Sequence, residues 1–202
     1  MTVHSPPSNN SVSEMNKSVE DQVARLEERI DQLEKTLAEP VGADPNALNL
    51  LVFDSGKDKL LAAFVMATGA AACGMKVSMF FTFWATAALR KGGSQASQKS
   101  MVEKAFGWML PNSIHRTKLS KMDFCGLGRA MMAQEMKRKN IADLDQLIET
   151  AADLGVTIKV CEMSMQLMGL RREELIDYPG LDYCGVAKFT EQAALSNTTL
   201  FI

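Results

Sequence analysis

The sequence predicts an α/β fold, with a mostly parallel sheet of about five strands and helices on both faces. Over residues 47–202, short apolar runs rich in β-branched residues alternate with longer helix-forming stretches, as in strand–helix–strand units. The run Leu48–Phe53 is almost continuously apolar, as expected for a strand that is buried on both faces. Hydrophobic residues make up 47% and charged residues 23% of the 202 positions, which is ordinary for a globular protein.

The N-terminal region is predicted to be separate from this α/β domain. Residues 1–13 are rich in Ser, Asn and Pro, a composition typical of a disordered tail. Over 14–39, apolar residues from Val19 to Leu37 recur at alternating spacings of four and three, which predicts a heptad helix. Such a helix either packs on its own domain or pairs with a second copy, and its mostly β-branched a positions and mostly Leu d positions favour a coiled coil. Residues 40–46, with two prolines and a glycine, are interpreted as a linker.

The first half of the domain is expected to contain two strands and their following helices. Leu48–Phe53 ends in the polar turn DSGKDK, after which an Ala-rich helix is predicted over 58–72. Aromatic and β-branched residues dominate Lys76–Phe83, the second predicted strand, and a short helix is expected over 84–90. The segment 101–125 is interpreted as a short helix followed by a basic loop.

Two uncharged runs in this half allow a membrane interpretation. Leu60–Met75 and Val77–Leu89 contain no charged residue, but each is shorter than the roughly 20 residues that span a bilayer. Lys76 would lie in the middle of a single span across both. We therefore favour a buried helix followed by a buried strand, with a membrane segment as the alternative.

The second half continues the alternation of helices and strands. The segments GRAMMAQEMKRKN and IADLDQLIETAADLG are predicted helices, the latter with an apolar face that starts at Ile141. Val156–Val160 is β-branched at four of its five positions and is expected to be a strand. A helix is predicted from Glu162, and Gly169 is expected to end it as a C-cap. A weak strand at Leu181–Tyr183, a helix over 186–196 and a final strand TTLFI complete the domain.

Cys161 is the first candidate for chemistry. Ligand sites of open parallel sheets lie at the carboxyl ends of the strands, and Cys161 lies between a predicted strand end and a predicted helix start. Unpaired N–H groups and the helix dipole at such a position favour the reactive thiolate. The alternative is a buried structural cysteine, since free cysteines are often buried.

The other cysteines rank lower. Cys125, in the Gly-flanked segment MDFCGLGRA, suits a resolving or relay thiol on a flexible loop, or is incidental there. Cys73 is expected to belong to the core, near the end of a buried helix. Cys184, before Gly185 at another strand–helix junction, is a secondary candidate.

Several functional classes lack their sequence signals. The net charge of −2 gives no electrostatic surface for nucleic acid. No C-x-x-C pair, P-loop or G-x-S-x-G segment occurs, and the chain has only two histidines, so neither a metal site nor a bound cofactor is expected. The polar N-terminus has no apolar signal segment, which favours the cytoplasm and reduced thiols.

The segment CEMSMQLMG, which begins at Cys161, resembles the C-x-M-S-M-x-x-M-G segment of the DsrE/DsrF-like family, in its DsrE-type sulfur-carrier branch. LNLLVFDSGKDKLLAAFVMATGAAACGMKVSMFFTFWA, MDFCGLGRAMM and YCGVAKFTEQAALSNTTLFI are also similar to segments of that branch. The resemblance covers about residues 47–202. Some relatives are predicted to lie in membranes, and the "peroxiredoxin" label often used for the branch does not fit, because the peroxidatic motif is absent.

The resemblance implies a homo-oligomeric sulfur carrier or sulfurtransferase. It implies that Cys161 accepts sulfane sulfur as a persulfide, and it places Cys125 where some members have a second cysteine. The implied partners are a rhodanese-like sulfur donor and a TusA-like carrier in a cytoplasmic sulfur relay. The alternative is a non-catalytic assembly protein, an oligomer built by the heptad helix and the α/β domain with purely structural cysteines.

Overall fold

The computed structural model describes residues 19–32, 44–96 and 99–202. The predicted tail 1–13 lies outside the described residues, as do both ends of the predicted heptad helix and residues 40–43. Within the described part, 19–32 is helical, as predicted. Its apolar residues are exposed in the single chain: Val19, Val23, Leu26 and Ile30. The coiled coil therefore stays a prediction, with an apolar stripe available for it.

Five strands form one parallel sheet in the order β4-β3-β2-β1-β5, which confirms the predicted fold class. The strands are β1 Asp44–Val52, β2 Lys76–Phe81, β3 Thr157–Cys161, β4 Leu181–Cys184 and β5 Ser196–Phe201. Each corresponds to a predicted strand, although β1 begins earlier than expected. Since every pair is parallel, all carboxyl ends lie at the same edge of the sheet.

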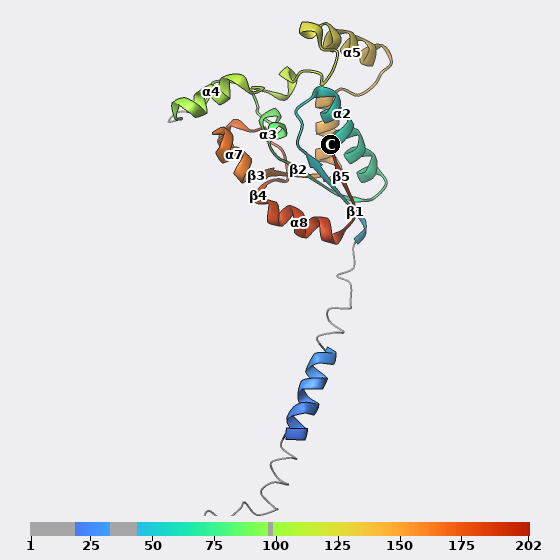
Figure 1. Ribbon diagram of the computed structural model, residues 1–202. Helices are drawn as coiled ribbons and strands as arrows, with labels where there is room; N and C mark the ends of the chain where they lie inside the picture. The colour runs from blue at the N-terminus through green and yellow to red at the C-terminus, as the bar shows by residue number, and fades with distance from the viewer. Residues whose placement is uncertain (1–18, 33–43, 97–98) are drawn as a thin grey trace, which may run out of the picture. The chain divides into compact units, whose positions relative to one another are not determined.

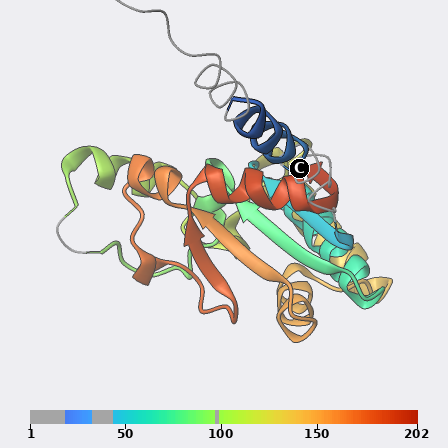
Figure 2. The same ribbon diagram turned by 90° about the horizontal axis from the view of Figure 1, so that it is seen from below.

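Helices cover both faces of this sheet, as Figure 1 shows. The α-helices are α2 Lys57–Ala72, α3 Trp84–Ala88, α4 Met101–Met109, α5 Leu127–Arg138, α6 Leu144–Asp153, α7 Glu162–Met168 and α8 Val186–Leu195. Helices α2 and α6 pack together over one face. Figure 2, the view from below, shows α8 lying across the opposite face.

Alternation along the central strands divides the core in two. Val52, Phe81 and Val160 face the cluster formed with α2, where the Phe64 and Phe81 rings lie 6.1 Å apart. Because successive strand residues point to opposite faces, Phe80 faces α8 and stacks on Phe189, with 5.1 Å between ring centroids. The two apolar faces explain why the second halves of β1 and β2 read as nearly continuous apolar runs.

The uncharged runs form the helix α2 and the strand β2, as favoured from the sequence. In α2, Leu60, Phe64 and Ala67 lie on the buried face. No helix within the described ranges has both the length and the apolar character needed to cross a bilayer.

Two expectations about single residues were wrong. Cys73 is exposed rather than in the core, because it caps the end of α2 and lies off the buried stripe of that helix. Ile141 is also exposed, because a capping box between Asp143 and Gln146, with two hydrogen bonds of 3.0 Å, starts α6 after it.

Candidate functional site

Cys161 is the last residue of β3 and the N-cap of α7, as the sequence predicted. β-branched residues hold β3 extended up to this point, and α7 begins at Glu162. Gly169 ends α7 in the left-handed conformation, with φ 63°, which confirms the predicted C-cap. The short helix therefore fixes both the position of the cysteine and the direction of the N–H groups that follow it.

The Cys161 side chain is only 2% exposed and packs with Phe80 and Phe189 on the α8 side of the sheet. Burial raises the pKa of its thiol. The hydroxyl and N–H of Ser164, the hydroxyl of Thr82 and the N–H of Met163 act in the opposite direction, and the pKa is lowered on balance. The neutral side chain makes no capping hydrogen bond to α7, so these groups act on the charge that forms when the proton leaves.

A small hydrogen-bond network orients these donors. The hydroxyls of Thr82 and Ser164 lie 3.0 Å apart, and the Phe83 N–H donates to the Ser164 hydroxyl oxygen over 2.9 Å. Either hydroxyl can donate to the other. In both arrangements one hydroxyl hydrogen remains to be shared with the sulfur, so the network can always offer a donor to a Cys161 anion.

The backbone of Phe83 is in an unusual conformation, with φ 44° and ψ −127°. A positive φ is strained for a residue with a bulky side chain, at a cost of roughly 1–3 kcal/mol. This conformation lies between β2 and α3 and directs the Phe83 N–H to Ser164. The strained backbone of Phe83 therefore lies where its N–H helps to hold the Ser164 hydroxyl in place.

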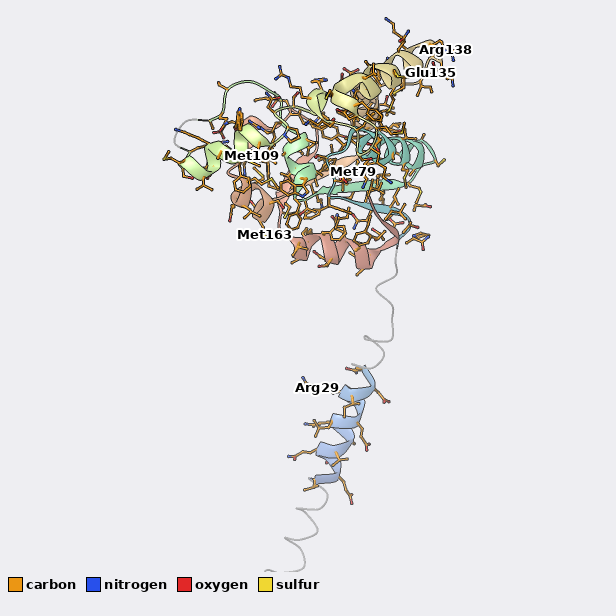
Figure 3. The ribbon with its side chains drawn as sticks, turned by 45° about the horizontal axis from the view of Figure 1, so that its top comes forward. Arg29, Met79, Met109, Glu135, Arg138 and Met163 are labelled. Atoms are coloured by element: carbon orange, nitrogen blue, oxygen red, sulfur yellow. The ribbon has the colours of Figure 1, made fainter. Side chains whose placement is uncertain are left out.

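A pocket of about 530 Å³ opens over Cys161. Phe80 and Thr82 line it beside the cysteine, and exposed apolar side chains line its mouth: Phe53, Phe83, Trp84, Met163 and Val186. Met163, labelled in Figure 3, projects from the first turn of α7. Other hollows of similar size lie beside α5 and α6 and beside α4, but no cysteine lines them. Among these three hollows of the described residues, the pocket over Cys161 joins a thiol to an apolar opening.

Cys125 is exposed and lies in the 3₁₀ turn Phe124–Gly126, just before α5. The turn is tight: Cys125 has φ 55°, and a Cβ on Gly128 would lie 2.0 Å from the Met122 carbonyl oxygen. Cys125 is not among the described residues that line the Cys161 pocket. In Figure 1 the helix that follows it, α5, lies beyond α2, away from α8. The structure does not bring the two predicted site residues together.

The cysteine that the sheet places beside Cys161 is Cys184. The two residues are register partners at the ends of β3 and β4, and Cys184 is partly exposed. Burial raises the pKa of the Cys184 thiol, with smaller contributions in the same direction from Asp182, Cys161 and Glu162, while Lys159 lowers it. Lys159, two residues before Cys161 in β3, is itself buried.

Sequence reasoning missed the residues that surround Cys161. Thr82 and Phe83 follow the end of β2, and only the folded sheet brings them to the sulfur. Ser164 had one available signal: it is the third residue of the helix that Cys161 caps, a position whose N–H points back to the cap. Within the described ranges, no group of three or more His, Cys, Asp or Glu side chains is arranged to hold a metal ion.

The sequence profile of the DsrE/DsrF/DrsH-like family matches residues 45–201. The chain belongs to this family. The match covers all five strands and the cysteine junction, so the family's domain is the α/β domain described above.

Two relatives extend this finding. The chain is 41% identical over 153 residues to the uncharacterized protein YrkE of Bacillus subtilis. That alignment covers 76% of this chain and 94% of YrkE. The chain is 31% identical over 151 residues to the sulfur carrier protein DsrE2 of Allochromatium vinosum. That alignment covers 69% of this chain and 87% of DsrE2. Both alignments include most of either protein.

Proposed function

We propose that this protein is a cytoplasmic sulfur carrier that accepts sulfane sulfur as a persulfide on Cys161 and passes it to a partner thiol. Membership of the DsrE/DsrF/DrsH-like family and the relative named a sulfur carrier support a role in sulfur relay. The observation that carries the assignment to Cys161 is the group of donors from Thr82, Met163 and Ser164, which lowers the pKa of a thiol at the base of an apolar pocket.

The chemistry is a sulfur exchange that needs no oxidant. The Cys161 thiolate attacks the terminal sulfur of a donor persulfide, a bond forms between the Cys161 Sγ and that sulfur, and the donor leaves as a thiolate. The proton of the transferred sulfur passes to the departing thiolate, so the negative charge then resides on the new terminal sulfur. Hydroxyl and N–H donors that favour the thiolate also favour this anion, and the apolar walls of the pocket limit its contact with water.

The proposed partners are proteins that exchange sulfur through cysteine. A rhodanese-like protein would supply the sulfur and a TusA-like carrier would receive it, with further copies of this chain in a homo-oligomer. The exposed apolar side chains at the mouth of the pocket, such as Trp84 and Met163, suit contact with a partner protein. Exposed Cys125 is proposed as an accessory thiol that exchanges with a partner rather than through the Cys161 pocket.

The test is a transfer experiment with three reduced proteins: the natural chain, Cys161→Ser and Cys73→Ser. Each is loaded with polysulfide, freed of excess reagent and offered glutathione as acceptor, and intact masses are followed. The natural chain and Cys73→Ser, whose cysteine is an exposed helix cap outside the site, should gain and then lose sulfur. Cys161→Ser should gain none at the site. If Cys161→Ser loads and delivers as the natural chain does, the assignment to Cys161 is wrong.

A further inference from the structure

The register of the sheet places two cysteines at adjacent positions on its carboxyl edge. Cys161 and Cys184 are Cα partners at the ends of the parallel strands β3 and β4. Neighbouring strands lie about 4.7–4.9 Å apart, within the roughly 4.4–6.8 Å over which two cysteines can share a bond between their sulfurs. Register partners point to the same face, and Cys184 packs against the cluster that contains Cys161. The two side chains are therefore neighbours.

The two thiols have opposite environments. Cys161 is buried and its pKa is lowered, despite the opposing effect of burial, by the hydroxyl and N–H donors of the site. Cys184 is partly exposed and its pKa is raised, first by burial. Cys161 is thus a buried thiol that ionises more easily, and its neighbour Cys184 is a more accessible thiol that ionises less easily.

Positive charge lies close to Cys184. Lys159, which is buried in the row of side chains before the two cysteines, acts on Cys184 and lowers its pKa. Lys188, in the first turn of α8, interacts favourably with a negative charge on Cys184. Asp182 and Glu162 oppose this effect. Both ammonium groups therefore favour negative charge on Cys184, although burial outweighs them and the pKa of its thiol is raised on balance.

We propose that Cys184 is the second sulfur-bearing thiol of this site, to which sulfane sulfur moves from Cys161 before a partner collects it. This inference rests on the proposed function of Cys161. The Cys184 sulfur attacks the terminal sulfur of the Cys161 persulfide, a new bond forms between those two atoms, and the bond from that sulfur to the Cys161 Sγ breaks. Cys161 leaves as a thiolate, and the proton of Cys184 passes to the new persulfide. No oxidant or reductant is consumed.

The direction of transfer follows from the chemistry of the two thiols. In sulfur exchange, the thiol with the lower pKa is the better leaving group, and the thiolate with the higher pKa is the stronger nucleophile. Cys161 fits the first description and Cys184 the second. Because Cys184 is also the more exposed, the transfer moves the sulfur outward, to where a partner's thiol can reach it.

Trypsin separates the two sites, since Arg171 and Arg172 lie between them. The full-length reduced protein, Cys184→Ser, Cys161→Ser and the control Cys73→Ser are loaded with polysulfide, alkylated at successive times and digested. We expect added sulfur first on the Cys161 peptide and then on the Cys184 peptide of the natural chain and of Cys73→Ser. Cys184→Ser should hold sulfur on Cys161 and deliver it more slowly to glutathione, and Cys161→Ser should load at neither cysteine.

The outcomes separate this inference from the proposed function. Sulfur that stays on Cys161, with Cys184→Ser delivering at the natural rate, overturns the transfer step and leaves the carrier function intact. A Cys161–Cys184 disulfide formed with release of sulfide also overturns it, because Cys184 would then end the persulfide rather than receive it. Failure of the natural chain to load at all contradicts the proposed function itself. Circular dichroism of Cys184→Ser and Cys184→Ala checks that both variants are folded. Slower delivery by a folded variant is then due to the missing thiol.

Discussion

The hydroxyls of Thr82 and Ser164 lie 3.0 Å apart, although 82 positions separate the two residues in the chain. Thr82 follows the end of β2 and Ser164 lies in the first turn of α7, so the contact forms only when β2 and β3 pair in the sheet. Both hydroxyls favour ionisation of Cys161. The lowered pKa of the Cys161 thiol therefore depends on a tertiary contact between two other residues.

Replacement of Ser164 by Ala should make Cys161 less reactive. A hydrogen bond to a charged group is worth about 1.5–3 kcal/mol, so alkylation of the Cys161 peptide near neutral pH should slow by about tenfold or more. Ser113→Ala is the matched control, because Ser113 is also buried but is not among the groups that lower the pKa of Cys161. Equal alkylation rates in the two variants would show that Ser164 does not tune the thiol.

The buried ion pair between Lys99 and Glu174 should contribute strongly to the stability of the protein. The Lys99 Nζ lies 2.6 Å from a Glu174 carboxylate oxygen, and both side chains are almost fully buried. Glu174→Gln leaves the Lys99 charge uncompensated and should cost about 3–5 kcal/mol in the free energy of unfolding. The control Glu135→Gln removes an exposed pair with Arg138, labelled in Figure 3, and should change the stability far less, because exposed ion pairs contribute little.

The loss of stability caused by Glu174→Gln should depend on pH. Burial opposes ionisation of Glu174, but Lys99 and the N–H groups of Arg171 and Ala96 lower its pKa below the ordinary 4.5. A carboxyl whose pKa is lowered by folding stabilises the protein above its unfolded pKa and loses that contribution as the pH falls through its folded pKa. Urea unfolding should therefore show a full difference between the natural chain and Glu174→Gln at neutral pH, shrinking below about pH 4.5. A difference that stays constant down to strongly acidic pH would contradict this role.

Two glycines, one at the C-cap of α7 and one inside α2, should respond in opposite directions to replacement by alanine. At Gly169, φ is +63° and a Cβ would lie 2.4 Å from the Glu103 side chain, so Gly169→Ala should destabilise the protein by about 1 kcal/mol or more. At Gly69, inside α2, a Cβ would meet nothing within 4 Å. Gly69→Ala should therefore stabilise it by about 0.5–1 kcal/mol. Urea midpoints that shift in the same direction would contradict this account.

The apolar stripe of the helix at 19–32 should drive self-association. Leu26 is exposed in the single chain and takes a d position of the predicted heptads, where a charge would be buried in a coiled coil. Leu26→Asp in the full chain should lower the mass of the assembly measured by light scattering. Ala24→Asp places the same charge at an outward heptad position and should not. An unchanged mass in both variants would favour a helix that makes no contact between copies.

Local signals were sufficient to predict most of the fold. β-branched runs located β3, the alternation of elements predicted a parallel sheet, and Gly169 ended α7 as expected. The rule that ligands bind at the carboxyl ends of strands selected Cys161, and the structure adds an apolar pocket above it. Each of these signals lies within one element or one junction.

What the sequence did not reveal depends on contacts between distant segments. The strained Phe83 backbone and the Thr82 hydroxyl reach Ser164 only through strand pairing. The register that makes Cys184 the neighbour of Cys161 is likewise a property of the whole sheet. Cys73 lies outside the core because it caps α2 beyond the buried stripe of that helix, which the residues around it do not indicate.

The most direct test of the central claim locates the sulfur after delivery by an enzyme. The reduced full-length protein is incubated with thiosulfate and a rhodanese, alkylated and digested. The masses of its cysteine-containing peptides are then measured by mass spectrometry. The account predicts one added sulfur on the peptide that contains Cys161, removable by reductant. A Cys161 peptide without added sulfur, under conditions that load a known sulfur carrier, would contradict the account and leave Cys161 as a residue of the core.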